Sequence, residues 1–311
     1  MKQTNPELSF LLRHPKYAWA ALSNYASFSS AQLHKYANNL HWLNVTFNRN
    51  INIDEDFIQD YLQFIPFANQ ELSGGSIEFN ERIAWSVELL NRYYSHWNWE
   101  CLAQNQNVVT NPLILAAFMN EFAPHYLEQN NGTESNADPY VQRLRERLRM
   151  VNLELENTLT WEDFYTKPKK LWKIVSSSEK LPWTIDRLEH HKFELSWDIL
   201  SNNTSLPWSE QLIRRYEKRW YWGSNEGDGL GLQFNFEIPW NASLLRDYSD
   251  RILSYPLSYN TNVDWNIDML IEFENWWDFE NLDSNSALWE KVFEGKIGDL
   301  EDLLWLLEKD F

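Results

Sequence analysis

The most constraining feature of this chain is the regular recurrence of a residue that can cap a helix. Ser, Thr, Asp or Asn stands at positions 29, 54, 86 and 111, and again at 184, 209, 241 and 266. The steps between successive positions are 25, 32 and 25 in each set, and the two sets differ by 155 throughout. The spacing therefore predicts a duplicated block of four units, with one lengthened unit at the same place in each block.

The unit around Ser209 shows why the spacing predicts helices. Pro207 biases the chain before it toward an extended conformation, and Ser209 is a favoured N-cap residue. Glu210 falls in the first turn, and Trp208 and Ile213 are placed to close a hydrophobic staple. The same three positions recur in all eight units, as Phe28/Ser29/Leu33, Ile53/Asp54/Ile58, Trp85/Ser86/Leu90, Thr110/Asn111/Leu115, Trp183/Thr184/Leu188, Trp208/Ser209/Ile213, Trp240/Asn241/Leu245 and Trp265/Asn266/Leu270.

We expect an all-α protein, namely an α-solenoid of eight short helix-turn-helix units in two four-unit blocks. The blocks are predicted at 1–127 and 160–311, with a loop and a bridging or capping helix over 128–159 and a capping helix at Leu300 to Lys309. Alternating apolar residues at the two lengthened units are compatible with a short strand or hairpin there. The alternative is an irregular helical protein in which common cap residues imitate a repeat.

Tryptophan is unusually abundant, with 18 residues among 311. Large rings allow short helices to bury enough apolar area, so packing is the favoured role; a stacking surface for bases or sugars is the alternative. An aromatic residue or His also follows the first member of each unit by eight positions. Because His191 stands at this position, we expect it to pack rather than to bind a metal.

Charge is the main indication of partners. The net charge is −18, and the stretch from Ile252 onward has 14 acidic residues and only three basic ones. Such a field favours a basic protein partner and disfavours direct binding of nucleic acid. One basic run, Arg143, Arg145, Arg147 and Arg149, is the exception that could bind nucleic acid. We favour the interpretation that it is a solvated face of a helix. A single cysteine, no signal-peptide pattern and no apolar run of membrane length predict a cytoplasmic protein with no membrane segment.

The sequence contains no recognisable catalytic, cofactor or metal motif. The lengthened segments Leu72 to Phe79 and Ser224 to Gly231 are predicted to bind a partner, because loops added to one repeat project from one face. A calcium loop at 225–229 and a metal or acid/base group at 278–283 are alternatives to a polar turn and plain surface charge, which are favoured. The candidate partner-binding residues are Glu71, Glu78, Asn225, Glu226, Asp228, Asp278, Glu280 and Asp283.

The stretch Leu200 to Ser209 has the pattern L-S-x-N-x-x-L-P-W-S, and Tyr216, Trp220 and Trp222 follow it. It resembles a Trp-rich short repeat found in uncharacterised proteins of bacteria and large DNA viruses. The resemblance covers roughly 17–122 and 172–276, closely in units six and seven and faintly in units one and two. It implies a repeat scaffold, and no catalytic residues come with it.

These features favour a non-enzymatic protein-interaction scaffold, for example an acidic inhibitor or immunity-type protein that neutralises a basic partner. Two alternatives remain open. One is a hydrolase or nucleotide-acting enzyme whose site forms between the two blocks. The other is a glycan-binding module that uses exposed Trp side chains.

Overall fold

The protein is all-α. The computed structural model describes residues 5–68, 76–118, 120–122, 171–224 and 229–309, and these residues contain helices and no strand. The chain divides into two compact units, one of Met1–Phe10 with Asp138–Leu303 and the other of Leu11–Ala137 with Leu304–Phe311. The predicted loop at 128–138 and the predicted helix at 139–159, with its Arg run, lie outside the described residues.

All eight predicted N-caps are confirmed. In each unit the cap side chain accepts a hydrogen bond from a backbone N–H two or three residues further on, which pairs a donor that the first helical turn leaves free. The helices that follow these caps are α3 (Ser30–Lys35), α5 (Glu55–Tyr61), α6 (Val87–Arg92), α9 (Pro112–Ala117), α13 (Ile185–His190), α15 (Glu210–Arg215), α16 (Ala242–Tyr248) and α18 (Ile267–Glu272).

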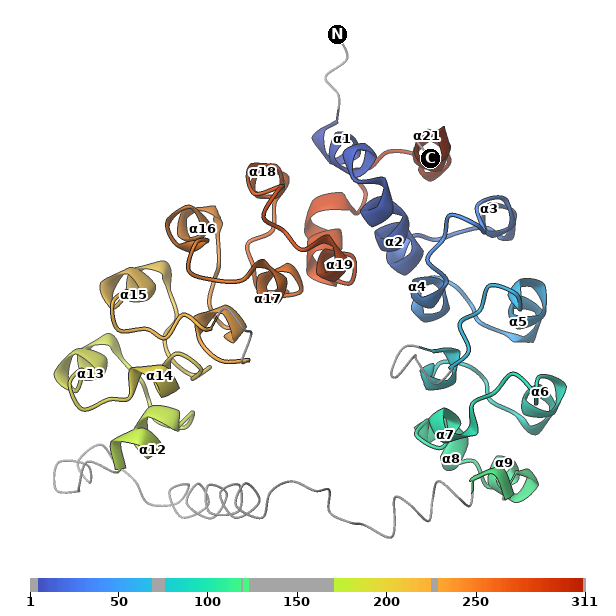
Figure 1. Cartoon of the computed structure of the whole chain (residues 1–311), viewed down its shortest axis with the longest axis horizontal. Helices are drawn as coiled ribbons and strands as arrows, with labels where there is room; N and C mark the ends of the chain where they lie inside the picture. The colour runs from blue at the N-terminus through green and yellow to red at the C-terminus, as the bar shows by residue number, and fades with distance from the viewer. Residues whose placement is uncertain (1–4, 69–75, 119, 123–170, 225–228, 310–311) are drawn as a thin grey trace. The chain divides into compact units, whose positions relative to one another are not determined.

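A second set of short helices lies before, between and after the capped ones along the chain. They are α2 (Pro15–Tyr25), α4 (Trp42–Phe47), α7 (Trp99–Leu102), α8 (Gln106–Val109), α12 (Leu171–Ser177), α14 (Trp197–Leu200), α17 (Ser254–Ser258) and α19 (Phe279–Leu282). Within each compact unit taken by itself, the capped helices form one row and the second helices another (Figure 1). Neighbours in the second row pack together, as α2 with α4, α12 with α14 and α17 with α19. The remaining helices are α1 (Pro6–Arg13), α20 (Ser286–Leu288), the π-helical turn η4 (Trp289–Phe293) and α21 (Leu300–Lys309), which has the predicted bounds.

The strand or hairpin considered at the lengthened units is wrong for the residues described there. These residues form 3-10 turns instead, η1 (Ile77–Phe79) and η3 (Leu232–Phe234). The alternation of apolar and polar residues does not match burial here: Leu230 and Phe236 reach the surface, whereas the intervening Gln233 and Asn235 are buried. The N–H groups of Phe234 and Asn235 bond back within the turn, so they are not available to a neighbouring strand.

Most of the described tryptophan rings are buried, as predicted. The side chains of Trp85, Trp183, Trp240 and Trp265 are at most 7 % exposed. Rings twelve residues apart meet in pairs, with centroids 5.2 Å apart for Trp85–Trp97, 5.0 Å for Trp208–Trp220 and 4.9 Å for Trp265–Trp277. Each pair joins the start of a capped helix to the chain that follows it, so the rings hold each helical hairpin closed.

A buried asparagine precedes six of the caps by six residues; we call this place position −6. Its Oδ1 atom accepts a hydrogen bond from the N–H two residues further on in every case. Its Nδ2 group donates to backbone carbonyls 22–34 residues earlier in five cases. Asn260 is the exception, because its Nδ2 has no hydrogen-bond partner among the described residues. The six residues are Asn48, Asn80, Asn105, Asn203, Asn235 and Asn260.

A second buried polar side chain lies eight residues before the cap, at position −8. In five units it accepts a hydrogen bond from the backbone N–H that lies 20 residues later. These acceptors are Glu78, Ser176, Ser201, Gln233 and Ser258. Thr46 is different because the residue 20 positions later is Pro66, which has no N–H. The Thr46 hydroxyl donates to the Leu43 carbonyl instead. Two other units have an alanine at position −8, Ala21 and Ala103. Where they are present, the polar side chains at positions −8 and −6 form a buried polar ladder that links neighbouring units.

Candidate binding surface

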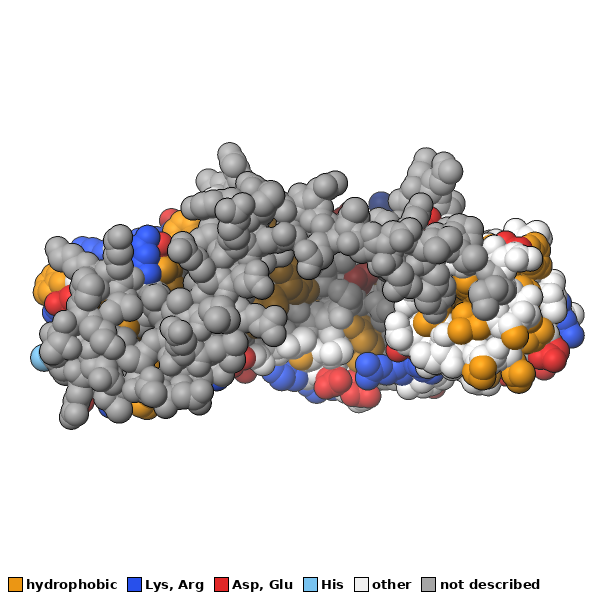
Figure 2. Space-filling model, turned by 90° about the horizontal axis from the view of Figure 1, so that it is seen from below, with side chains coloured by type: hydrophobic (Ala, Val, Ile, Leu, Met, Phe, Trp, Pro, Cys, Tyr) orange, Lys and Arg blue, Asp and Glu red, His pale blue; other side chains and the backbone are white. Residues whose placement is uncertain are grey.

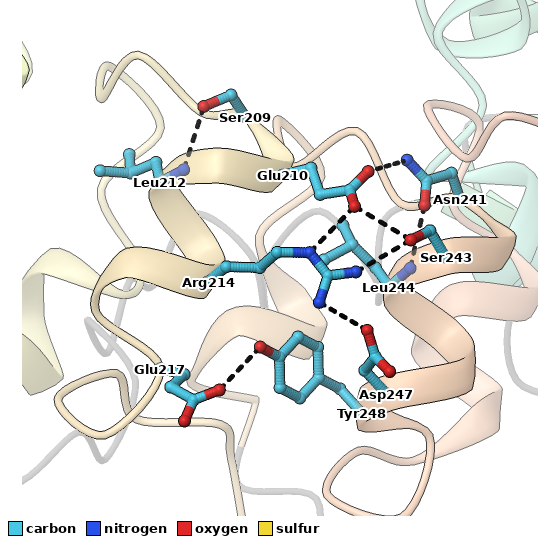
Figure 3. Close-up of polar contacts among 10 residues, drawn as sticks. All are labelled: Ser209, Glu210, Leu212, Arg214, Glu217, Asn241, Ser243, Leu244, Asp247 and Tyr248. Carbon is cyan, nitrogen blue, oxygen red and sulfur yellow. Dashed lines mark hydrogen bonds and ion pairs between the residues drawn. The ribbon is translucent and has the colours of Figure 1, made fainter.

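The row of capped helices carries most of the charged contacts between neighbouring units. Arg214 of α15 is the clearest case (Figure 3): its Nε donates to Glu210 at 2.9 Å, and its two other nitrogens donate to Asp247 at 2.5 Å and Ser243 at 2.9 Å. Glu210 also accepts from Asn241, the cap of the next unit, at 3.1 Å. The hydrogen bonds from Asn241 and Arg214 lower the pKa of Glu210, and those to Asp247 and Glu210 raise the pKa of Arg214.

Tyrosine hydroxyls of this row also bond to glutamates of the preceding unit. The Tyr248 hydroxyl donates to Glu217 at 2.9 Å (Figure 3). The Tyr216 hydroxyl donates to Glu189 at 2.7 Å. Lys192 also donates to Glu189, and this bond together with that of Tyr216 lowers the pKa of Glu189 to about 2. Charged groups of this row therefore join one unit to the next, and their chemistry is structural.

The second row carries an open hollow of about 530 Å³ beside the lengthened part of the second block. It is lined by Asp198, Ile199, Asn202, Tyr221 and Leu230. Ile199 and Tyr221 are half-buried, and Leu230 is 50 % exposed. The Ser196 hydroxyl donates to the Asp198 carboxylate and lowers its pKa, so this carboxylate is ionised at neutral pH. The hollow thus combines an apolar lining with one negative charge.

The turn at Gly231 lies next to the hollow and is bonded to Asn202, one of its lining residues. Gly231, which has φ of +95°, donates its N–H to Asn202 Oδ1 at 2.8 Å. A Cβ atom at Gly231 would lie 2.5 Å from the nitrogen of Gly223, so only glycine allows this close approach of the two backbone segments. Leu230 is thereby fixed at the edge of the hollow. It lies in the segment Ser224 to Gly231, one of the two predicted binding elements.

The eight candidate residues from the sequence fall in different places. Glu71, Asn225, Glu226 and Asp228 lie outside the described residues. Glu78 is fully buried at position −8, and it accepts hydrogen bonds from the N–H groups of Ala68 and Asn98, so it does not contribute to the surface. The structure brings the other three, Asp278, Glu280 and Asp283, together on or beside α19.

Asp278 is the N-cap of α19, and it accepts from the Glu280 N–H at 3.1 Å and from the Asn281 side chain at 2.9 Å. Its carboxylate is therefore engaged in capping the N-terminus of the helix, while Glu280 is exposed. Within the described ranges, no three His, Cys, Asp or Glu side chains are grouped closely enough to hold a metal ion. His191 is 5 % exposed and packs on Trp172 with ring centroids 4.8 Å apart, as its aromatic position predicts. Burial lowers the pKa of this histidine.

The hollow itself cannot be predicted from the sequence, because Asp198 and Tyr221 come from different units and belong to no motif. The insertion at 224–231 is the signal that points to it. In the space-filling view, hydrophobic side chains reach the surface between charged side chains of both signs (Figure 2). Across the described helices, none has both the length and the apolar character needed to cross a bilayer.

Comparison with protein-family models, with curated proteins and with solved structures found no match to this chain. The resemblance to Trp-rich short repeats therefore stays a prediction.

Proposed function

We propose that this protein is a non-enzymatic scaffold that binds a basic protein partner, and that its units stack as a solenoid in each block. The observation that carries the proposal is the hollow of Asp198, Ile199, Asn202, Tyr221 and Leu230. Its apolar lining suits an aliphatic or aromatic side chain of a partner, and the ionised Asp198 suits an adjacent Lys or Arg. The net charge of −18 supports a basic partner, because it would steer one toward the surface.

The regular spacing of the units supports the scaffold role. Buried residues at positions −8 and −6 maintain the hairpins, so the exposed side chains can vary from unit to unit without loss of the fold. An acidic inhibitor or immunity-type protein is a specific form of this proposal. The enzyme hypothesis, with a site between the blocks, stays a prediction. The glycan hypothesis needs exposed Trp rings, and among the described Trp residues only Trp305, at 48 %, is largely exposed.

A charge substitution at the rim of the hollow tests the proposal. We expect tagged protein to retain a basic protein from extracts of its native host, and moderate salt to release it. Leu230→Lys should abolish this retention, because it places a positive charge beside Asp198 where a basic partner would sit.

The matched control is Leu113→Lys, which changes a leucine that is 72 % exposed in α9 of the first block and should keep the partner. Retention of an acidic partner only, or equal retention by both variants, would contradict the proposal.

A further inference from the structure

The two blocks share the buried asparagines of position −6 in their last three units, but they differ in the exposed residues of the second row. By the same offset of 155 that relates the caps, Phe236, Tyr255 and Tyr259 of the second block correspond to Glu81, Glu100 and Gln104 of the first block. The three residues of the first block are exposed. An aromatic ring is therefore not needed at these places to form the unit, and the rings of the second block require another explanation.

The rings of the second block form a continuous surface feature, the aromatic strip, made of Phe234, Phe236, Tyr255 and Tyr259. The turn η3 packs against α17, which brings Phe234 to 5.8 Å from Tyr255 between ring centroids. Phe236 meets Tyr259 at 5.4 Å, edge to face, and Tyr255 lies 6.5 Å from Tyr259. Phe236 is 37 % exposed and the other three rings are half-buried, so each presents part of its surface to solvent.

Some rings of the capped row, unlike those of this strip, lie under a cation of the chain itself. Arg215 lies 5.6 Å from the Tyr216 centroid, and Arg251 lies 5.5 Å from that of Tyr248. No Lys or Arg of the described residues lies over a ring of the aromatic strip. The described stretch 229–309 that contains the strip has 16 acidic and five basic residues. Partly exposed rings in an acidic field attract a cation from outside the chain.

The spacing of the two tyrosines suggests how such a cation is presented. Side chains on one face of an extended peptide repeat every two residues, or about 6.6 Å. The Tyr255 and Tyr259 centroids are 6.5 Å apart. Two basic side chains separated by one residue in an extended segment can therefore reach the two rings together.

We propose that the aromatic strip binds an extended segment of the basic partner in which Arg or Lys alternates with other residues. The cations stack on Tyr255, Tyr259 and Phe236. This inference rests on the proposed function, because it names the chemistry by which the basic partner is held.

The test exchanges the strip for the residues of the first block. The triple variant Phe236→Glu, Tyr255→Glu and Tyr259→Gln carries side chains that equivalent units already accommodate. The probe is a synthetic peptide of four Arg-Thr pairs, and calorimetry measures its dissociation constant. A second peptide with its four arginines at every third position tests the spacing, and it should bind more weakly than the alternating peptide.

We expect the triple variant to bind the alternating peptide about tenfold more weakly than the unchanged protein, from the loss of two or three exposed cation–π contacts. The variant is more acidic by two charges, so general electrostatic attraction predicts the opposite, tighter binding. The reciprocal variant Glu81→Phe, Glu100→Tyr and Gln104→Tyr should raise the stoichiometry from one peptide to two. Circular dichroism of each variant confirms that it remains helical.

Equal or tighter binding by a folded triple variant would overturn the inference and leave the proposed function in place. If the unchanged protein fails to bind the alternating peptide, the inference fails as well. The proposed function is then judged by the separate retention experiment with Leu230→Lys.

Discussion

Glu78 and Gln233 hold the same buried position −8 in the two lengthened units, one in each block. The Oε1 atom of Glu78 accepts a hydrogen bond from the Asn98 N–H at 3.0 Å, and that of Gln233 accepts from the Leu253 N–H at 2.7 Å. A carboxylate and an amide thus perform the same role. The position requires an acceptor oxygen within hydrogen-bond distance of the N–H 20 residues later, and it does not require a charge.

This equivalence predicts the effect of changing Glu78. Glu78→Gln keeps an acceptor for the part-buried Asn98 N–H, whereas Glu78→Ala leaves that N–H without a partner. We expect Glu78→Ala to lower the free energy of unfolding by about 1–3 kcal/mol more than Glu78→Gln does, as measured by urea denaturation. Equal loss in the two variants would show that the acceptor oxygen is not what the position requires.

Asn203 offers a test of position −6. Its Nδ2 donates to the carbonyls of Ser176 at 2.9 Å and Ser178 at 3.0 Å, and its Oδ1 accepts from the Ser205 N–H at 2.9 Å. Asn203→Ala leaves these groups unpaired, so the free energy of unfolding should fall by about 3 kcal/mol. Asn275→Ala, at an exposed asparagine, is the control and should change stability little. A similar loss in both variants would argue against the ladder.

The N-caps should be exchangeable between units. Ser209 accepts from the Leu212 N–H at 3.2 Å, and Asn241 and Asn266 make the corresponding bond in their own units. Ser209→Asn should therefore retain stability, while Ser209→Ala should cost about 1 kcal/mol. Thermal unfolding followed by circular dichroism measures the difference, and an alanine variant of undiminished stability would mean that the cap adds nothing.

The Glu189 contacts predict a pH dependence. Hydrogen bonds from Lys192 and Tyr216 lower the pKa of Glu189 from 4.5 to about 2 in the folded protein. A lowered carboxyl pKa stabilises the fold above the unfolded value, and this stabilisation is lost as the pH falls from 4.5 toward 2. Glu189→Gln should therefore show a shallower fall in the urea midpoint across this range. The same slope in both proteins would exclude the contribution of Glu189.

The sequence is sufficient to predict the caps, because an N-cap is a local device. Ser209 and its helix lie within a few residues of each other, and the same steps in both blocks make the pattern visible. The burial of the tryptophans follows from the same reasoning, as does the aromatic place of His191. The helical fold class therefore follows from local signals alone.

The ladder and the binding surface cannot be predicted in the same way. By local reasoning Asn203 belongs to a polar turn, yet its partner carbonyls, those of Ser176 and Ser178, belong to the preceding unit. Glu78 is expected at the surface because it is charged and lies in an inserted segment, whereas the backbone N–H groups around it account for its burial. The spacing of Ser201 and Asn203 before the cap recurs in other units, and this recurrence is the signal that could have revealed the ladder.

The central feature of this protein is the buried ladder, and native-state hydrogen exchange measured by NMR tests it most directly. The N–H groups of Asn98, Ser196, Tyr221, Leu253 and Asp278 lie ahead of a second helix or of the turn η3, and each donates to a buried side chain 20 residues earlier. We predict exchange at least about 100-fold slower than for an unprotected peptide at all five. Ser201→Ala should speed the exchange of Tyr221 far more than that of Leu253. Exchange of these five N–H groups at unprotected rates would contradict the account.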